Sequence, residues 1–176
     1  MRLVPVGNIA RAVRGPRRRG RGATGVAMWA ILIACGAFLS AVLWMDLMFD
    51  VQVLRHRAAA ELPEPVLASI AAYYRRVTTD AWPMGRVIGV VMLIAAVSLI
   101  VQFVRAPSWV AAVSLVLAGG PLVLVPRIVR SAVRLGTRTD SIAQQSTIAR
   151  AICRDHLVCL TGIALFVALQ LLAGGG

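Results

Sequence analysis

The chain has 176 residues, 59% of them apolar and only 15% charged, and this balance excludes an ordinary water-soluble domain because too little polar surface would remain. All nineteen basic residues are arginine and only seven residues are acidic, giving a net charge of +12. The arginines flank apolar segments without interleaved aromatic residues, so the charge indicates anionic lipid head groups as partners and argues against nucleic acid. We interpret the exclusive use of arginine as a bacterial coding bias.

Three cysteines, Cys35, Cys153 and Cys159, are too few and too unevenly spaced for a disulfide framework or a zinc site. Cys153 and Cys159 would point in different directions on one helix, so they are not expected to bridge. We interpret all three as small buried apolar residues. No motif implies a cofactor, and no metal site is predicted.

The first part of the chain is a basic tail followed by a membrane span. Residues 1–23 contain seven arginines and no acidic residue, which is typical of a disordered tail held to anionic head groups. Residues 24–45 are uncharged and long enough to cross a bilayer. An alternative is a lipoprotein signal cleaved before Cys35, but the apolar run continues for ten residues beyond it.

The helical pattern does not end with this first span. Apolar residues keep a helical stripe and the first proline is Pro63, so the first helix is expected to run for about 35 residues, or roughly 50 Å at 1.5 Å per residue. An amphipathic helix is then predicted over about 65–81, lying on the membrane surface or packed back on the first helix.

Three further spans are predicted at about 84–104, 109–125 and 152–172. The connection at 105–108 is so short that the second and third spans must be antiparallel neighbours. A kink is expected at Gly119-Gly120-Pro121, and after Pro126 an arginine ladder continues the helix. The last helix is expected to begin at about Ile142, capped by Asp140 or Ser141, with the fourth span as its second half.

These segments predict an all-α polytopic membrane protein whose single domain, 24–172, is an antiparallel up-down bundle of four transmembrane helices, followed by a flexible C-terminus at 173–176. The helices are expected to extend beyond the membrane on one side, where all seven acidic residues collect. Because the dense basic tail precedes the first span, we expect both termini in the cytoplasm and the protein in a bacterial inner (plasma) membrane.

The projecting ends form a polar cap that contains every candidate for chemistry. Asp46 and Asp50 would share one stripe of the first helix with Arg57 and Glu61, while His156 faces the bundle interior. Ionisable groups at this depth are costly unless they are paired. One interpretation is a salt-bridge network in which the carboxylates meet the arginine ladder after Pro126 and His156 caps the core. The other is a ligand site. A divalent-metal site of the two carboxylates and the imidazole, or haem held between His56 and His156, is a weaker alternative.

The order of these features resembles the four-helix anthrone-oxygenase-like membrane proteins. The residues that carry the resemblance are Asp46 to Asp50 at the end of the first span, together with Arg150, Arg154 and His156 in an Arg-x-x-x-Arg-x-His approach to the last span. The resemblance covers 24–172 and implies a four-helix membrane fold and an oxygenase activity.

Three functions follow as hypotheses. The first is a lipid-binding protein or an accessory subunit of a larger membrane complex or homo-oligomer. In it acidic lipid or protein groups would contact Arg127, Arg130, Arg134, Arg150 and Arg154. The second is a membrane enzyme for an apolar aromatic or quinone-like substrate, with His156 as acid or base and Asp46 or Asp50 orienting it. The third is a small transporter that uses the glycine-proline break and Asp46.

Overall fold

The computed structural model describes residues 23–174, and every regular element within them is helical. The elements are α1 (Ala23–Asp50), the 3-10 helix η2 (Val51–His56), α2 (Glu64–Thr79), α3 (Trp82–Arg105), α4 (Trp109–Thr137) and α5 (Ile142–Gly174). Four long helices are apolar enough to cross a membrane: Gly25–His56, Pro83–Arg105, Trp109–Thr137 and Ile142–Gly174. The expected all-α bundle of four antiparallel spans is therefore confirmed, while the tail at 1–22 lies outside the described residues.

Local signals place the helix ends. Pro65 and Pro83 stand in the first turns of α2 and α3, where a missing N–H costs nothing. The Ser108 hydroxyl accepts a hydrogen bond from the Ala111 amide at the start of α4, and Ser141 does the same for Gln144 at the start of α5. At the end of α4, Arg138 adopts a left-handed conformation with φ of 53°, which stops the helix.

The first helix has the expected length but changes its winding. It is α-helical to Asp50 and continues as η2 only to His56, after which 57–63 form a loop. The predicted stripe of Asp46, Asp50, Arg57 and Glu61 is therefore wrong in its second half, because the last two residues lie beyond the helix.

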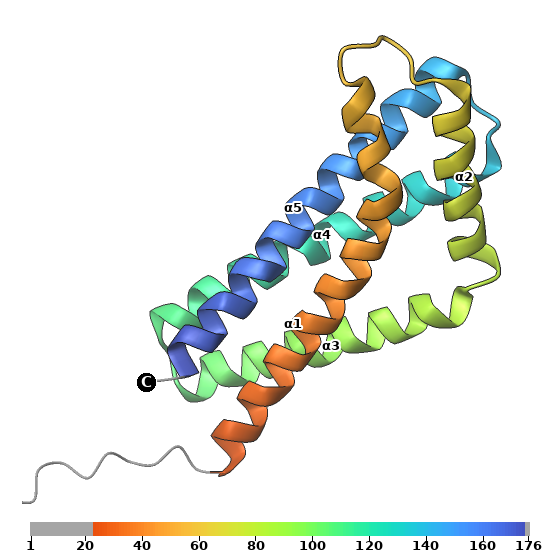
Figure 1. Cartoon of the computed structure of the whole chain (residues 1–176). Coiled ribbons are helices and arrows are strands. Elements are labelled where there is room, and N and C mark those ends of the chain that lie inside the picture. The colour runs from red at the N-terminus through yellow and green to blue at the C-terminus, as the bar shows by residue number, and fades with distance from the viewer. Residues whose placement is uncertain (1–22, 175–176) are drawn as a thin grey trace, which may run out of the picture.

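The two ends of the bundle are built from different elements (Figure 1). The N-terminal end of α1, the turn between α3 and α4, and the C-terminal end of α5 lie at one end of the bundle, as expected. At the other end, α2 crosses beside α4, with further contacts to α1, α3 and α5. The amphipathic helix thus packs mainly on α4, whereas the sequence left its place open between the membrane surface and the first helix.

The larger buried core lies where α2 packs on the ends of the long helices. It includes Leu67, Ile70 and Tyr74 of α2 together with Leu135 of α4 and Ile152 of α5. A smaller cluster of Leu32, Leu99 and Phe166 lies within the spans. The difference in size has a physical cause. Burying an apolar side chain stabilises the fold where the side chain would otherwise contact water, and does little where it would otherwise contact lipid.

Candidate functional site

Two carboxylates of α1 and one imidazole of α5 meet beneath α2. The Nδ1 atom of His156 lies 2.6 Å from Oδ2 of Asp50, and its Nε2 atom lies 3.9 Å from Oδ2 of Asp46. The side chain of Asp50 is fully buried, that of His156 is 5% exposed and that of Asp46 is 17% exposed. The three residues that the sequence nominated for catalysis are therefore brought together.

Two adjacent tyrosines of α2 complete the hydrogen bonding. The Tyr74 hydroxyl donates to Oδ1 of Asp50 at 2.7 Å, and the Tyr73 hydroxyl donates to Oδ1 of Asp46 at 2.5 Å. The Tyr73 ring also stacks on Phe49, with centroids 4.1 Å apart. Burial, followed by the neighbouring carboxylates, raises the pKa of both phenols above the ordinary tyrosine value, so both remain protonated donors.

These tyrosines were missed as site residues by sequence reasoning. Both lie within the amphipathic helix predicted over about 65–81, and neither was among the candidate site residues. The available signal was the adjacent Tyr-Tyr pair itself, because buried phenols require hydrogen-bond partners and the nearest predicted polar groups were carboxylates. What the sequence could not supply was the placement of α2 across α1.

The salt-bridge interpretation paired Asp46 and Asp50 with the arginines that follow Pro126, but among the described residues both carboxylates face His156 and the ion pairs found for these arginines are with other carboxylates. Arg127 of α4 instead lies 3.0 Å from the carboxylate of Asp155, with Nε facing Oδ2. Arg154 contacts the other oxygen of Asp155 at 3.5 Å. Asp155 points away from the imidazole next to it in sequence, because consecutive residues of a helix project in different directions.

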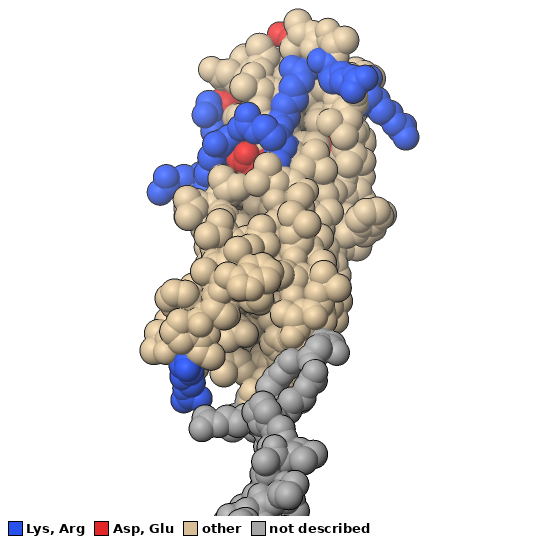
Figure 2. All heavy atoms as spheres, turned by 90° about the vertical axis from the view of Figure 1, so that its left-hand side faces the viewer, with Lys and Arg blue, Asp and Glu red and all other residues tan. Residues whose placement is uncertain are grey.

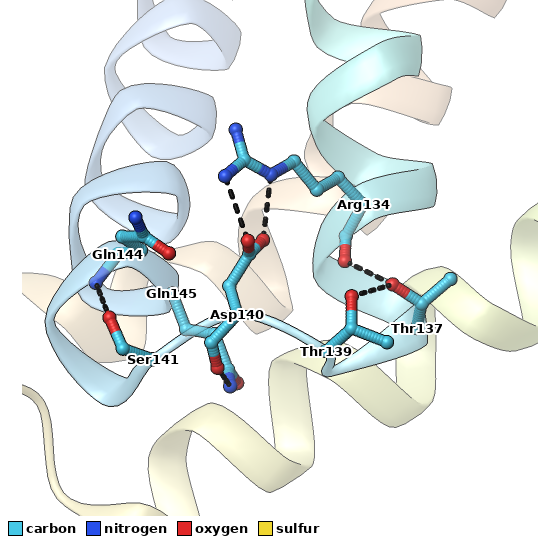
Figure 3. Close-up of polar contacts among 7 residues, drawn as sticks. All are labelled: Arg134, Thr137, Thr139, Asp140, Ser141, Gln144 and Gln145. Carbon is cyan, nitrogen blue, oxygen red and sulfur yellow. Dashed lines mark hydrogen bonds and ion pairs between the residues drawn. The ribbon is translucent and has the colours of Figure 1, made fainter.

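The other nominated arginines lie on the polar cap but serve different contacts. Arg134 forms a two-fold hydrogen bond with the carboxylate of Asp140, at 2.7 and 2.8 Å, across the turn between α4 and α5 (Figure 3). Arg150 donates to the carbonyls of Ala59 and Ala60 at 2.7 and 3.1 Å and so holds the loop after η2. Arg130 is exposed, and within residues 23–174 no ion-pair partner is found for it.

An elongated cavity of about 290 Å³ reaches the site from inside the membrane. Among the residues that line it, Asp46, His156 and Cys159 are the only ones in the described chain with ionisable side chains. The remainder are mainly aliphatic: Leu39, Val42, Leu43, Ile88, Met92, Leu99, Ile100, Leu115, Leu122, Val125, Ile128, Val129 and Ile163. The cavity is thus an apolar chamber with one polar end.

The contact with a carboxylate assigns the roles of the two ring nitrogens. Because a carboxylate only accepts, Nδ1 carries the proton directed at Asp50, and the Nε2 lone pair is left beside Asp46 at the cavity. The 3.9 Å between Nε2 and Oδ2 of Asp46 is too long for a hydrogen bond, so a ligand oxygen has room to contact both. The arrangement suits proton exchange with a ligand whose body is apolar.

Within residues 23–174, no group of three or more His, Cys, Asp or Glu side chains is arranged so that it could hold a metal ion. Two carboxylate oxygens that the metal hypothesis required instead accept from Tyr73 and Tyr74. His56, proposed as a haem partner, lies at the end of η2 and its carbonyl accepts from Arg150 at 3.4 Å.

The fold and site define the chain as a four-span helical membrane protein with a buried Asp-His pair at the end of an apolar cavity. No protein-family model matches it, and no curated protein or solved structure is significantly similar to it. Its function is therefore inferred from the chemistry of the site.

Proposed function

We propose that this protein binds an apolar, ring-bearing molecule of the phenol or quinone type in its membrane cavity, and that His156 exchanges a proton with the polar group of that molecule. The observation that carries the proposal is the orientation of His156, with Nδ1 held by Asp50 and Nε2 beside an apolar chamber. Asp50 sets the tautomer and stabilises the imidazolium that forms when Nε2 takes a proton. Asp46, held by Tyr73, orients the ligand oxygen.

The size and polarity of the cavity support this ligand class. A cavity of about 150 Å³ accommodates benzene, so one ring would occupy about half of the chamber. Aliphatic walls favour an apolar body, and the single polar end favours one oxygen-bearing group over a polyhydroxylated molecule. The oxygenase activity implied by the resemblance to anthrone-oxygenase-like proteins stays a prediction, as does placement in a bacterial inner membrane with cytoplasmic termini.

The test uses the full chain in lipid nanodiscs and 2-decyl-4-nitrophenol, whose phenolate absorbs visible light. Near the nitrophenol pKa, we expect wild-type protein to raise the phenolate fraction, because the phenol proton passes to Nε2. His156→Gln should abolish this increase. His56→Gln is the matched control, since His56 is the other histidine and does not line the cavity. Equal phenolate signals from wild type and His156→Gln would contradict the proposal.

A second candidate function is the binding of anionic lipid head groups at the polar cap. Figure 2 shows arginines gathered at one end of the molecule, and the side chains of Arg127, Arg134 and Arg154 are 50%, 55% and 66% exposed. Ion pairing already engages these three, which leaves Arg130 as the best test. If head groups bind here, Arg130→Gln should reduce the retention of phosphatidylglycerol over phosphatidylcholine in native mass spectrometry, whereas His156→Gln should not. A larger complex or homo-oligomer stays a prediction.

A further inference from the structure

The cavity is long and lies along the bundle, with its polar end near the cap. On α1 its lining extends from Asp46 back to Gly36, ten residues or about 15 Å of helix. Asp46 lies about 30 Å along the span from Gly25, which is the thickness of a hydrocarbon core. The polar end therefore lies at interfacial depth on the cap side, and the apolar end extends toward the middle of the bilayer.

The cavity walls differ in exposure. The α5 residues that line it, His156, Cys159, Ile163 and Phe166, are all buried. Exposed lining residues come only from α3 and α4 within the described chain: Ile100 at 54%, Leu122 at 39% and Val129 at 52%. The two helices meet at their hairpin and diverge toward α2 (Figure 1). The open side of the cavity is thus a slot between α3 and α4.

This slot faces lipid and is apolar along its length. Next to its exposed lining residues, α3 presents Val97 and Phe103 outward and α4 presents Val123, which is 79% exposed. Crossing such a surface is unfavourable for a water-soluble ligand, whereas a molecule dissolved in the bilayer already lies beside it.

We infer that the ligand is a single-headed, long-chain amphiphile, a phenol or quinol with an alkyl or isoprenoid tail, taken up sideways from the cap-side leaflet through the slot between α3 and α4. This inference rests on the proposed function, because the head is the group that meets His156. The head at interfacial depth and the tail toward the bilayer middle are the positions such a molecule holds in lipid. Since a ring fills about half of the chamber, most of a long tail must lie in the slot.

Adjacent glycines of α4 provide a matched pair of variants. Gly119 lines the cavity and Gly120 does not, and a Cβ at either position meets no atom within 4 Å. Gly119→Phe introduces a ring at a position that lines the chamber, whereas Gly120→Phe introduces the same ring at a position that does not. Both substitutions replace a glycine within a helix, so both folds should survive.

The experiment uses two photoprobes built on 4-decylphenol in nanodiscs of phosphatidylcholine and phosphatidylglycerol. One carries a diazirine on the first chain carbon and the other on the last. We expect the first probe to label α1 and α5 near Asp46 and His156, and the second to label α3 and α4 along the slot, around Ile100 and Leu122. Excess unlabelled 4-decylphenol should suppress both signals.

Gly119→Phe should weaken labelling by both probes on the order of tenfold, the loss of about 60 Å² of apolar contact, while Gly120→Phe leaves it unchanged. Tail labelling on α2 or the cap loops, or equal effects of the two glycine variants, would overturn lateral uptake while head labelling still supports the proposed function. Absence of head labelling near His156 in wild-type protein would instead overturn the proposed function and this inference together.

Discussion

The imidazole of His156 is bonded through Nδ1 to Oδ2 of Asp50 at 2.6 Å, and the two residues are 106 positions apart in the chain. The same carboxylate accepts from Tyr74 through its other oxygen. Both carboxylate oxygens of Asp50 thereby have hydrogen-bond partners inside the protein, which makes Asp50 a support for the imidazole, while Asp46 is the carboxylate at the cavity.

Removing one member of this network should destabilise the fold. Tyr74→Phe deletes a buried donor to Asp50, and we expect a loss of about 1–2 kcal/mol in the free energy of unfolding. Combined with Asp50→Asn in a double-mutant cycle, the coupling energy should be about 1 kcal/mol, because the two side chains share one hydrogen bond. Denaturant titration in detergent micelles measures both values, and additive effects would show that the bond contributes nothing.

The stability of the loop after η2 should depend on the guanidinium of Arg150, which donates hydrogen bonds to several carbonyls of the loop. Arg150→Lys cannot reproduce donation to several carbonyls, so amides of the loop, such as that of Leu62, should exchange roughly tenfold faster with deuterium. Arg154→Lys is the control, since Arg154 bonds only to its neighbour Asp155 among the contacts found for it. Unchanged exchange in Arg150→Lys would mean that the Leu62 amide bond to Ser146 holds the loop by itself.

Close packing of α4 and α5 should require Gly162. A Cβ at this position would lie 2.9 Å from the Leu117 carbonyl oxygen, which belongs to rigid helix backbone. Gly162→Leu should therefore separate the helices and cost about 1–3 kcal/mol. Gly89→Leu is the control, because a Cβ at Gly89 meets no atom within 4 Å. Equal melting temperatures for the two variants would refute the steric argument.

Acid should weaken the attachment of α2 to the end of α4. Arg138 bonds to Glu64 at 2.8 Å, and this hydrogen bond and charge lower the pKa of the Glu64 carboxyl below its ordinary value. A lowered carboxyl pKa contributes stability that is present above the unfolded value, about 4.3, and is lost as pH falls through the folded pKa. Thermal unfolding at pH 7 and pH 3 should show a smaller decrease for Glu64→Gln than for wild type.

Asp140 is a comparison for that pH effect, since the hydrogen bond from Arg134 likewise lowers the pKa of its carboxyl. Asp140→Asn should also reduce the loss of thermal stability between pH 7 and pH 3. Its effect should add to that of Glu64→Gln, because the two ion pairs are separate. If both variants lost as much stability at pH 3 as wild type does, other carboxylates would be responsible for the acid sensitivity.

Much of the fold follows from sequence because each span carries its own signal. A run of apolar residues of bilayer length must be helical in lipid, and a short connection such as 105–108 leaves its helices no choice but to be antiparallel. The location of the site followed for a related reason: Asp46, Asp50 and His156 each stand at the polar end of a span, so the bilayer itself gives them one depth.

The side chains that contact Asp46, Asp50 and His156 at that depth could not be predicted. The depth of a residue in the membrane does not say which way its helix is rotated, and the arginines that follow Pro126 were an equally reasonable choice as partners of the carboxylates. The packing of α2 determines these contacts. Its apolar face packs on α4 and places Tyr73 and Tyr74 over Asp46 and Asp50. The helix ends at His56, so Arg57 and Glu61 lie in the following loop and outside the expected stripe.

What the sequence by itself determined is therefore the number of spans, their antiparallel order and the end at which polar groups collect, since each is set by hydrophobicity along the chain. What only the tertiary structure decided is that Asp50 supports His156, that Asp46 faces a cavity, and that the cavity opens between α3 and α4. These depend on side-chain packing between segments far apart in the chain, whose energies no local pattern encodes.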